Sequence, residues 1–342
     1  MEKIEINSLT LEESKELMVR IGEKSYRGQQ LFTALNKNKI LDIDEIQVLA
    51  KSTRVKLLDI ARINKPSILK RYDSKLDETS KYLFLLEDNN IIESVLMKYS
   101  HGNTACVSTQ VGCKMACEFC ASTKDGFVRN LSPAEILNQV YMIEEDLNIN
   151  INNIVIMGSG EPLDNFDNTL KFIKILHHEM GHNTSYRNIT LSTCGLVPRI
   201  YDLAKENLPI TLSISLHSPF DEERRKIMPI ARKYNVEELM KASKEYLKAT
   251  NRRLTFEYTL IEGVNDGEKE VNELARILKG INGHVNLIPL NPITEYELDR
   301  PDFSRVKSFR NKLINRNIKT TIRKEMGSDI SGSCGQLRKN NL

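Results

Sequence analysis

The strongest constraint on the fold is a regular alternation of short apolar segments and longer amphipathic segments, which begins at Thr104 and runs almost to the end of the 342-residue chain. The apolar segments have the length and β-branched content of strands, and the segments between them have the period of helices. Such alternation indicates parallel strands joined by right-handed helical crossovers. The predicted helices are 132–146, 166–180, 197–206, 236–249, 267–279 and 303–315, and the predicted strands are ACVSTQ, NIVIMG, NITLST, ITLSISL, LTFEYTLI, HVNLIPL and IKTTIRK.

About six strand–helix units favour a partial or full β/α barrel, with a doubly wound open sheet as the competing architecture. Residues 1–65 predict helices that end at Lys65-Pro66, because a residue before proline resists the helical conformation. Residues 66–103 predict a small antiparallel meander, with apolar runs separated by polar turns. We therefore predict an α/β fold: a partial (β/α)6 barrel over 104–342, an N-terminal helical accessory domain and a short antiparallel β extension.

Composition narrows the class of protein. Hydrophobic residues make up 40% and charged residues 28%, the profile of a globular chain. No apolar run approaches the roughly 20 residues that span a bilayer, and the N-terminus lacks the apolar centre of a signal peptide. We expect a cytoplasmic protein. The net charge of +3 does not by itself indicate nucleic acid, but Lys51 to Lys75 contains eight Lys/Arg and two Asp, a basic block that suits either a solvated helix face or RNA.

Three of the six cysteines fall within eight residues, as Cys113-Lys-Met-Ala-Cys117-Glu-Phe-Cys120, directly after the first predicted barrel strand. This C-x3-C-x2-C spacing allows three thiolates on one loop to bind three irons of a [4Fe–4S] cluster, leaving the fourth iron without a protein ligand. Structural zinc usually takes four protein ligands. The nearest histidines, His101 and His177, do not lie at zinc-finger spacing, which favours the cluster over structural zinc. Structural zinc and free thiols remain the alternatives to the cluster.

Polar residues follow the predicted barrel strands at their carboxyl ends, where β/α barrels carry their functional residues. Gly158-Ser-Gly-Glu-Pro162 follows the second strand, Ser192 ends the third and Ser213 to Ser218 ends the fourth. A GxGEP sequence alone indicates only a strand-to-helix turn, although its glycines would allow the backbone to approach a ligand closely. These segments are expected to line one mouth of the barrel.

A C-x3-C-x2-C loop after the first strand of a β/α barrel resembles the signature of radical S-adenosylmethionine (SAM) enzymes. The resemblance implies that the amino and carboxylate groups of SAM bind the open iron. It also implies that one electron from the cluster breaks the sulfonium bond and gives a 5′-deoxyadenosyl radical. The SAM contacts carried over from the family are Gly160, Glu161, Ser192, Ser215, Leu216, His217 and Asn291.

Further motifs in the same order resemble one branch of these enzymes, the dual-specificity rRNA/tRNA adenine-C2 methyltransferases, over essentially the whole chain. They are Cys106-Val-Ser-Thr-Gln-Val-Gly, GEPLDN, LSTCG, SLHSP, VNDG and the C-terminal GSDISGS-Cys334-G. The resemblance implies that one SAM methylates Cys334 and that a second SAM supplies the radical. The methyl group then reaches carbon 2 of an adenosine in 23S rRNA, at the peptidyl-transferase centre, and in tRNA, next to the anticodon.

The resemblance also gives roles to Glu93 and Cys106. Glu93, thirteen residues before Cys106, would be the base that removes the ring proton. Read without the family, it is an exposed charge alternating with apolar strand residues. Cys106 would attack the Cys334 sulfur and leave a disulfide bond, which requires a thiolate within reach. Since an unperturbed cysteine has a pKa of about 8.5, a cationic or cluster-side setting would help Cys106.

The resemblance implies RNA as partner, contacted through phosphates by the basic block and by Arg323, Lys324, Arg338 and Lys339. We also expect an electron donor such as flavodoxin or ferredoxin, no membrane contact and a monomer. The charged run Glu222 to Lys226 is expected to be a solvated helical turn.

Three alternatives stay open. One is C8 methylation of the same rRNA adenosine, by the related antibiotic-resistance branch. That branch typically departs from the GEP sequence after the glycine–glutamate pair, whereas Glu161-Pro162 is present here, which favours C2. The others are a non-catalytic iron–sulfur protein and a zinc-stabilised RNA-binding module, but an iron–sulfur protein without this chemistry leaves Glu93, Cys106 and Cys334 unexplained.

Overall fold

The computed structural model describes residues 3–291 and 298–337, and the structural statements below concern these residues. Their main feature is a ten-stranded sheet with the order β14-β13-β12-β11-β10-β9-β6-β5-β4-β3. From β6 to β14 the strands run parallel and follow one another in space as they do in sequence. This is the strand order of a barrel, whereas in a doubly wound sheet the order of the strands reverses at a switch point. Because β14 and β3 are both edges, the barrel is partial. The parallel strands are β6 (Gly102–Cys106), β9 (Asn153–Ile156), β10 (Ile189–Thr193), β11 (Thr211–Ser215), β12 (Leu254–Leu260), β13 (Gly283–Pro289) and β14 (Thr320–Ile322).

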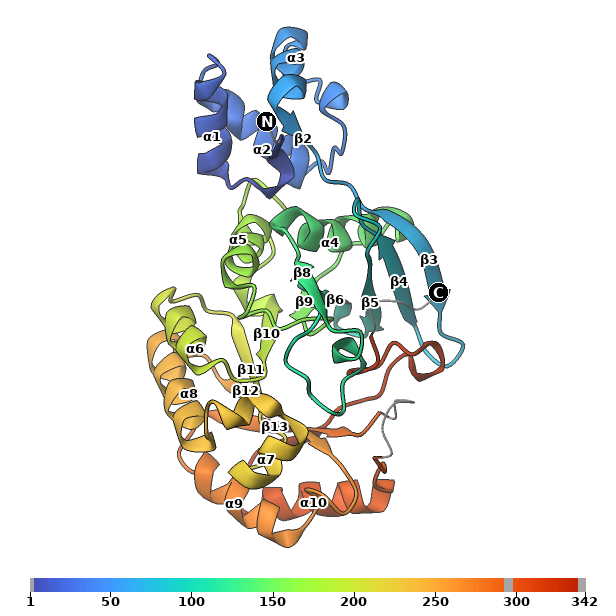
Figure 1. Ribbon diagram of the computed structural model, residues 1–342, viewed down its shortest axis with the longest axis vertical. Helices are drawn as coiled ribbons and strands as arrows, with labels where there is room; N and C mark the ends of the chain where they lie inside the picture. The colour runs from blue at the N-terminus through green and yellow to red at the C-terminus, as the bar shows by residue number, and fades with distance from the viewer. Residues whose placement is uncertain (1–2, 292–297, 338–342) are drawn as a thin grey trace.

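Helices cover the outer face of the parallel strands (Figure 1). The first begins at the predicted capping box, in which Ser132 Oγ accepts from Glu135 N at 3.3 Å and the Glu135 carboxylate accepts from Ser132 N at 2.9 Å. One apolar core fills the space between helices and sheet. The predicted helices are confirmed as α4 (Pro133–Leu147), α5 (Phe166–His177), α6 (Val197–Lys205), α8 (Val236–Thr250), α9 (Glu268–Leu278) and α10 (Phe303–Asn315).

The predicted antiparallel meander is confirmed as β3 (Ser67–Asp73), β4 (Thr79–Leu85) and β5 (Ile91–Tyr99). It is continuous with the barrel, because β5 pairs antiparallel with β6, with Val95 opposite Cys106. Side chains two residues apart share one face of a strand, so Glu93, Val95 and Met97 lie on the same side of β5. The meander therefore brings Glu93 and Cys106 onto neighbouring strands.

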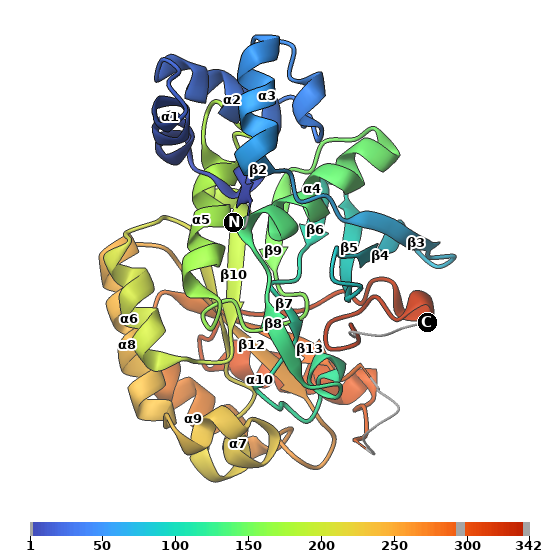
Figure 2. The same ribbon diagram turned by 45° about the horizontal axis from the view of Figure 1, so that its top comes forward.

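The N-terminal helices α1 (Leu11–Arg20), α2 (Tyr26–Asn36) and α3 (Lys51–Ile60) surround a second apolar core. The short parallel strands β1 (Ile4–Glu5) and β2 (Ala61–Arg62) join the two ends of this unit. Two-residue strands have no readable period, so the sequence did not predict them. The unit rests on α4 and α5 (Figures 1 and 2), where Ser8 Oγ accepts from Ala134 N at 3.0 Å and Lys171 pairs with Glu13 at 2.7 Å.

Two small elements lie near the strand ends. The hairpin of β7 (Gln110–Gly112) and β8 (Phe127–Asn130), which was not predicted, encloses the three-cysteine loop, and the predicted helical turn at Glu222 to Lys226 is α7 (Asp221–Ile227), which follows β11. Among the described residues, no helix has both the length and the apolar character needed to cross a membrane. The 3-10 helices are Ile6–Ser8, Ile43–Glu45, Ala121–Thr123, Tyr186–Asn188, Pro229–Arg232 and Ser328–Ile330.

Candidate active site

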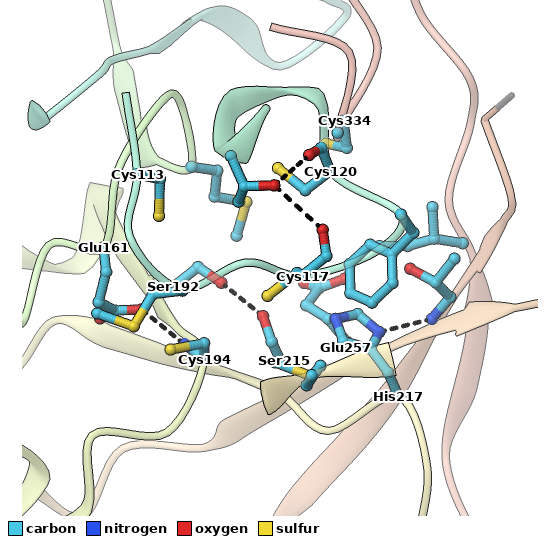
Figure 3. Close-up of a pocket in the computed structure, with 18 of the residues that line it drawn as sticks. Cys113, Cys117, Cys120, Glu161, Ser192, Cys194, Ser215, His217, Glu257 and Cys334 are labelled. Carbon is cyan, nitrogen blue, oxygen red and sulfur yellow. Dashed lines mark hydrogen bonds between the residues drawn. The ribbon is translucent and has the colours of Figure 1, made fainter. Parts of the chain in front are cut away.

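One cavity lies at the carboxyl ends of the parallel strands (Figure 3). Its open space, including solvent at the mouth, is about 930 Å³. The three clustered cysteines line one side, and the ends of β9, β10 and β11 line the other. The structure thereby brings together most of the residues predicted from sequence: Cys113, Cys117, Cys120, Gly160, Glu161, Ser192, Ser215, His217, Asn291 and Cys334.

The backbone fixes the shape of the three-cysteine loop. Gly112 begins it with φ +72°, and a Cβ at this position would lie 1.8 Å from the Gly126 carbonyl oxygen. Near the other end, Thr123 Oγ1 donates to the Cys120 carbonyl at 2.9 Å. Between them, Glu118 N donates to the Ile227 carbonyl at 3.0 Å, which anchors the loop on α7. The loop is thus held to the hairpin on one side and to a helix on the other.

The three thiols suit an iron–sulfur cluster in number and position. Burial raises the pKa of each, that of Cys113 to about 12, so a bound metal must offset the cost of forming the thiolates. In the described ranges, no three His, Cys, Asp or Glu side chains converge as they would around a single ion. The thiolates of a [4Fe–4S] cluster each bind a different iron and do not need to converge on one point. The donor set fits the predicted cluster.

The GSGEP turn after β9 forms the wall opposite the cysteines. Gly160 has φ +105°, and a Cβ there would lie 2.6 Å from Gln110 Cβ. The buried Glu161 carboxylate accepts from the backbone N of Cys194 at 2.7 Å and of Leu163 at 3.0 Å, which ties the turn to the end of β10. Burial raises the pKa of Glu161 and these hydrogen bonds oppose the rise. Glu161 therefore braces the wall, and its contact with SAM stays a prediction.

His217 presents a neutral imidazole to the cavity. Its Nδ1 accepts from Thr259 N at 2.9 Å, which places the proton on Nε2 (Figure 3). Burial lowers the pKa of His217 to about 3, and the nearby Arg224 charge adds to this effect. The ring can therefore act as a hydrogen-bond donor at neutral pH. Beside it, the hydroxyls of Ser192 and Ser215 lie 3.5 Å apart on neighbouring strands.

Two predicted SAM contacts are arranged differently from the rest. The Leu216 side chain is fully buried in the main apolar core and does not line the cavity, because it alternates to the other face of the strand end from Ser215. A contact of Leu216 with SAM would have to be made by its backbone and stays a prediction. Asn291 does line the cavity, but its Nδ2 donates to the Cys334 carbonyl at 2.9 Å and so fixes the C-terminal loop.

The C-terminal loop docks on the three-cysteine loop, and Cys334 lies beside Cys120 (Figure 3). Ala121 N donates to the Gly335 carbonyl at 2.7 Å. Ser122 Oγ donates to the Leu337 carbonyl at 2.7 Å. Cys334 is therefore presented to the cavity by a loop whose backbone is hydrogen-bonded to the three-cysteine loop directly after the cysteine.

The outer end of the same loop is tied to the turn between β3 and β4. Asp329 accepts from Ser74 Oγ at 2.7 Å and from Lys75 N at 2.8 Å. Gly327 N donates to Asp77 Oδ2 at 2.9 Å. The loop thus spans from β14, at one edge of the sheet, to the hairpin at the other edge.

A second cavity adjoins the first, and Cys334 and Arg323 line both. Cys106 lines only the second, with Val95 and Met97 from β5. Burial, and secondarily Cys334, raise the pKa of Cys106 to about 12, and the Arg323 charge opposes them. Arg323, predicted to contact RNA phosphates, lines both cavities, and its charge interacts with Cys334 and Cys106; its contact with RNA stays a prediction. Arg338 and Lys339, also predicted to contact RNA, lie outside the described residues.

Glu93 is fully buried, so the exposed position expected from strand alternation alone is wrong. Lys81 Nζ, itself buried, lies 3.4 Å from Glu93 Oε1. Strands β4 and β5 continue the barrel sheet and are buried on both faces, which alternation within one strand could not reveal. Because Glu93 shares its face of β5 with Val95 and Met97, its role as a base stays a reasonable prediction.

Two charged residues near the site were not predicted. Glu257 lines the first cavity and accepts from Ser213 Oγ and Asn286 Nδ2, both at 2.9 Å. The sequence could have indicated Glu257, because it is the one charged residue in the otherwise apolar predicted strand LTFEYTLI. Arg224 is fully buried, so the prediction of a solvated helical turn is wrong at this position. A run of five charged residues gives no indication of which one turns inward.

Comparisons with known proteins agree with this geometry. The family model for the radical SAM superfamily matches residues 107–275. Proteins named "probable dual-specificity RNA methyltransferase RlmN" from Clostridioides difficile and Clostridium novyi are 53% and 50% identical, over 98% of this chain and 98% of each relative. The crystal structure of a radical SAM methyltransferase from Sphaerobacter thermophilus matches with a TM-score of 0.93 at 40% identity, covering 98% of this chain and 100% of that one. The chain belongs to the RlmN family of dual-specificity RNA methyltransferases, within the radical SAM superfamily.

Proposed function

We propose that this protein methylates carbon 2 of an adenosine in 23S rRNA and in tRNA, and that Cys334 carries the methyl group between SAM and the base. The observation that carries the proposal is the position of Cys334, which lines two adjoining cavities. One contains the three clustered cysteines and the other contains Cys106. A thiol that receives a methyl group on one side and is attacked by a second thiol on the other requires this arrangement.

The residues of the first cavity would bind SAM and the cluster. Cys113, Cys117 and Cys120 would hold a [4Fe–4S] cluster, which together with SAM supplies a 5′-deoxyadenosyl radical. His217 can donate from Nε2, and the hydroxyls of Ser192 and Ser215 can donate or accept. The Cys334 sulfur would take the methyl group of a first SAM, leaving S-adenosylhomocysteine, and a second SAM would be used for each transfer.

The second cavity would complete the reaction. Glu93 would take the proton from carbon 2 once the Cys334 methylene is bonded to the ring, and the electron left unpaired on the ring would return to the iron–sulfur site that supplied it. Cys106 would then attack the Cys334 sulfur, so that a sulfur–sulfur bond forms while the bond between the sulfur and the new methyl carbon breaks, and that carbon would take a proton to become the methyl group. Arg323, beside both sulfurs, favours the thiolate that this step requires. An external dithiol would reduce the disulfide for the next turnover.

RNA would approach over the meander. Strand β3 is largely exposed, and Lys70 Nζ lies 4.6 Å from the Tyr72 ring centroid. We expect Lys70→Glu to weaken RNA binding at low salt and to leave SAM cleavage intact. Arg71 is less informative, because it pairs with Asp146 at 2.7 Å and its reversal would also break that contact. Lys244→Glu, at an exposed position of α8, is the matched control and should bind RNA as wild type does; unchanged binding in Lys70→Glu contradicts this surface.

The deciding experiment is mass spectrometry of RNA digests after reaction with isotopically labelled SAM. A label on C2 of adenosine supports the proposal, and a label on C8 assigns the chain to the resistance chemistry. The Cys106→Ala protein should accumulate RNA joined covalently to Cys334, since the releasing thiol is missing. Stoichiometric zinc in place of iron in anaerobically purified protein would refute the radical mechanism. A one-electron donor such as flavodoxin or ferredoxin, a monomeric state and a cytoplasmic location belong to the same proposal.

A further inference from the structure

Arg224, in the middle of α7, is the largest fully buried side chain among the described residues. Its guanidinium donates to three backbone carbonyls. Nη2 donates to Cys194 O at 2.7 Å and Ser215 O at 3.2 Å, and Nε donates to Leu216 O at 3.0 Å. These carbonyls lie at the ends of β10 and β11, so one side chain joins the two strand ends that form the SAM-side wall.

The charge on Arg224 has no carboxylate partner among the ion pairs of residues 3–291 and 298–337. Carbonyl dipoles satisfy its N–H groups but leave a net positive charge in a dry interior, which is costly without a nearby anion. Burial lowers the pKa of Arg224, and the groups that oppose this are Cys194, Cys117 and Asp221. Cys117 is one of the three cysteines predicted to bind iron. The anion that this site lacks would therefore be supplied by a cluster with its thiolates.

The packing around Arg224 leaves the guanidinium little freedom to move. Glu118 N, within the three-cysteine loop, donates to the carbonyl of Ile227 at the end of α7. Ile227 also packs against Cys113 and Cys117 in a shared apolar cluster. On the other side, Gly195 has φ +104°, and a Cβ there would lie 3.3 Å from Arg224 Nη2. The charge is thus fixed between the cysteine loop and the strand ends.

We propose that Arg224 is a positioning residue for the iron–sulfur site: its buried charge stabilises the electron added to the cluster on Cys113, Cys117 and Cys120. The same guanidinium holds the SAM-side wall in place. The inference rests on the proposed function only in requiring that cluster. Reduction adds one electron from the external donor and no proton, so the cluster gains one negative charge beside a fixed cation. Removing the cation must therefore make the cluster harder to reduce.

The test is an anaerobic redox titration of the full-length, reconstituted protein, followed by electron paramagnetic resonance. Arg224→Met and Arg224→Gln remove the charge, and Arg224→Lys keeps it while losing the planar donor geometry. We expect the neutral variants to lower the equilibrium constant for reduction about tenfold, which is about 59 mV for a one-electron couple. Arg224→Lys should keep the wild-type midpoint but bind SAM more weakly. The control is Arg225→Met, which removes an exposed charge from the same helix and should change neither quantity.

The outcomes separate a charge effect from a structural one. A wild-type midpoint in an iron-loaded neutral variant overturns the inference, as does an equal shift in Arg224→Lys. If both neutral variants fail to take up iron while Arg224→Lys loads normally, the charge is still required and the inference stands. If all three fail, the role is structural and the inference is wrong. The site of RNA methylation is measured separately on the wild type, so a product other than 2-methyladenosine would sink the proposed function without affecting this test.

Discussion

The thiol of Cys106 provides the most quantitative prediction, because burial raises its pKa from an ordinary value near 9.0 to about 12. A difference of about three pH units, at about 1.36 kcal/mol each, makes the thiolate about 4 kcal/mol harder to form. At pH 8 about one Cys106 thiol in 10,000 is ionised, against about one in ten for a thiol with a pKa of 9. The reactivity of Cys106 should therefore keep rising throughout the accessible pH range.

The assay is alkylation by iodoacetamide, quantified at each cysteine by mass spectrometry, in cluster-loaded Cys334→Ala protein. Removing Cys334 takes away one contribution that raises the Cys106 pKa, but burial is the larger cause and remains. We expect the rate at Cys106 to rise about tenfold per pH unit from pH 7 to pH 10 without levelling off, because the thiolate fraction does so. Limited access of the reagent lowers every rate but does not change this slope.

Arg323→Met extends the same test. Arg323 opposes the rise in the Cys106 pKa, so its loss should lower the alkylation rate at every pH and leave the slope unchanged. Reactivity that levels off with a midpoint below about pH 9.5 would refute the argument, since burial would then not control ionisation of the Cys106 thiol. An unchanged rate in Arg323→Met would show that this cation does not act on Cys106.

Three further predictions concern other parts of the site. Lys81→Met removes the cation that lies 3.4 Å from the buried Glu93 carboxylate and should lower the free energy of unfolding in urea by roughly 3–5 kcal/mol. The same change should cost less in a Glu93→Gln protein, and an equal loss of stability in the two proteins would argue against the ion pair. Gly160→Ala, at φ +105° and against Gln110, should cost roughly 1–3 kcal/mol and weaken SAM binding by calorimetry, whereas Gly126→Ala, with nothing within 4 Å of a Cβ, should leave SAM binding unchanged. Because the pKa of His217 is about 3, SAM affinity should show no histidine titration between pH 5 and 8; a midpoint near 6.5 that disappears in His217→Gln would contradict this.

Much of the fold could be predicted because its determinants are local. A capping box starts α4, and an apolar run bounded by polar turns marks each barrel strand, so element positions agreed within a few residues. The strand ends then followed from the architecture, since parallel strands bring their carboxyl ends to one side of the sheet. This placed Ser192, Ser215 and His217 around one cavity with the cysteine loop.

The remaining features depend on contacts between distant segments, which no local pattern contains. The sequence around Glu93 reads as an ordinary alternating strand, yet Glu93 is fully buried in the folded sheet, where it pairs with Leu83 of β4. Arg224 stands between Glu223 and Arg225 in a run that predicts solvent exposure. It is buried because α7 crosses the ends of β10 and β11, where unpaired carbonyls need donors. The prediction for Arg224 failed because its side chain donates hydrogen bonds to backbone carbonyls of other segments of the chain.

The order of the strands gives a reason for the position of Cys334. A barrel that fails to close leaves two edges, here β14 and β3, on either side of an opening. The chain leaves β14 at Ile322 and crosses this opening to the turn after β3, where Asp329 binds Ser74 and Lys75 (Figure 2). It then returns to the cysteine loop through Gly335. A loop fixed at both edges and hydrogen-bonded over the cavity can offer one sulfur to two neighbouring cavities. A closed barrel has no free strand edges, and so it has no opening for such a loop to cross.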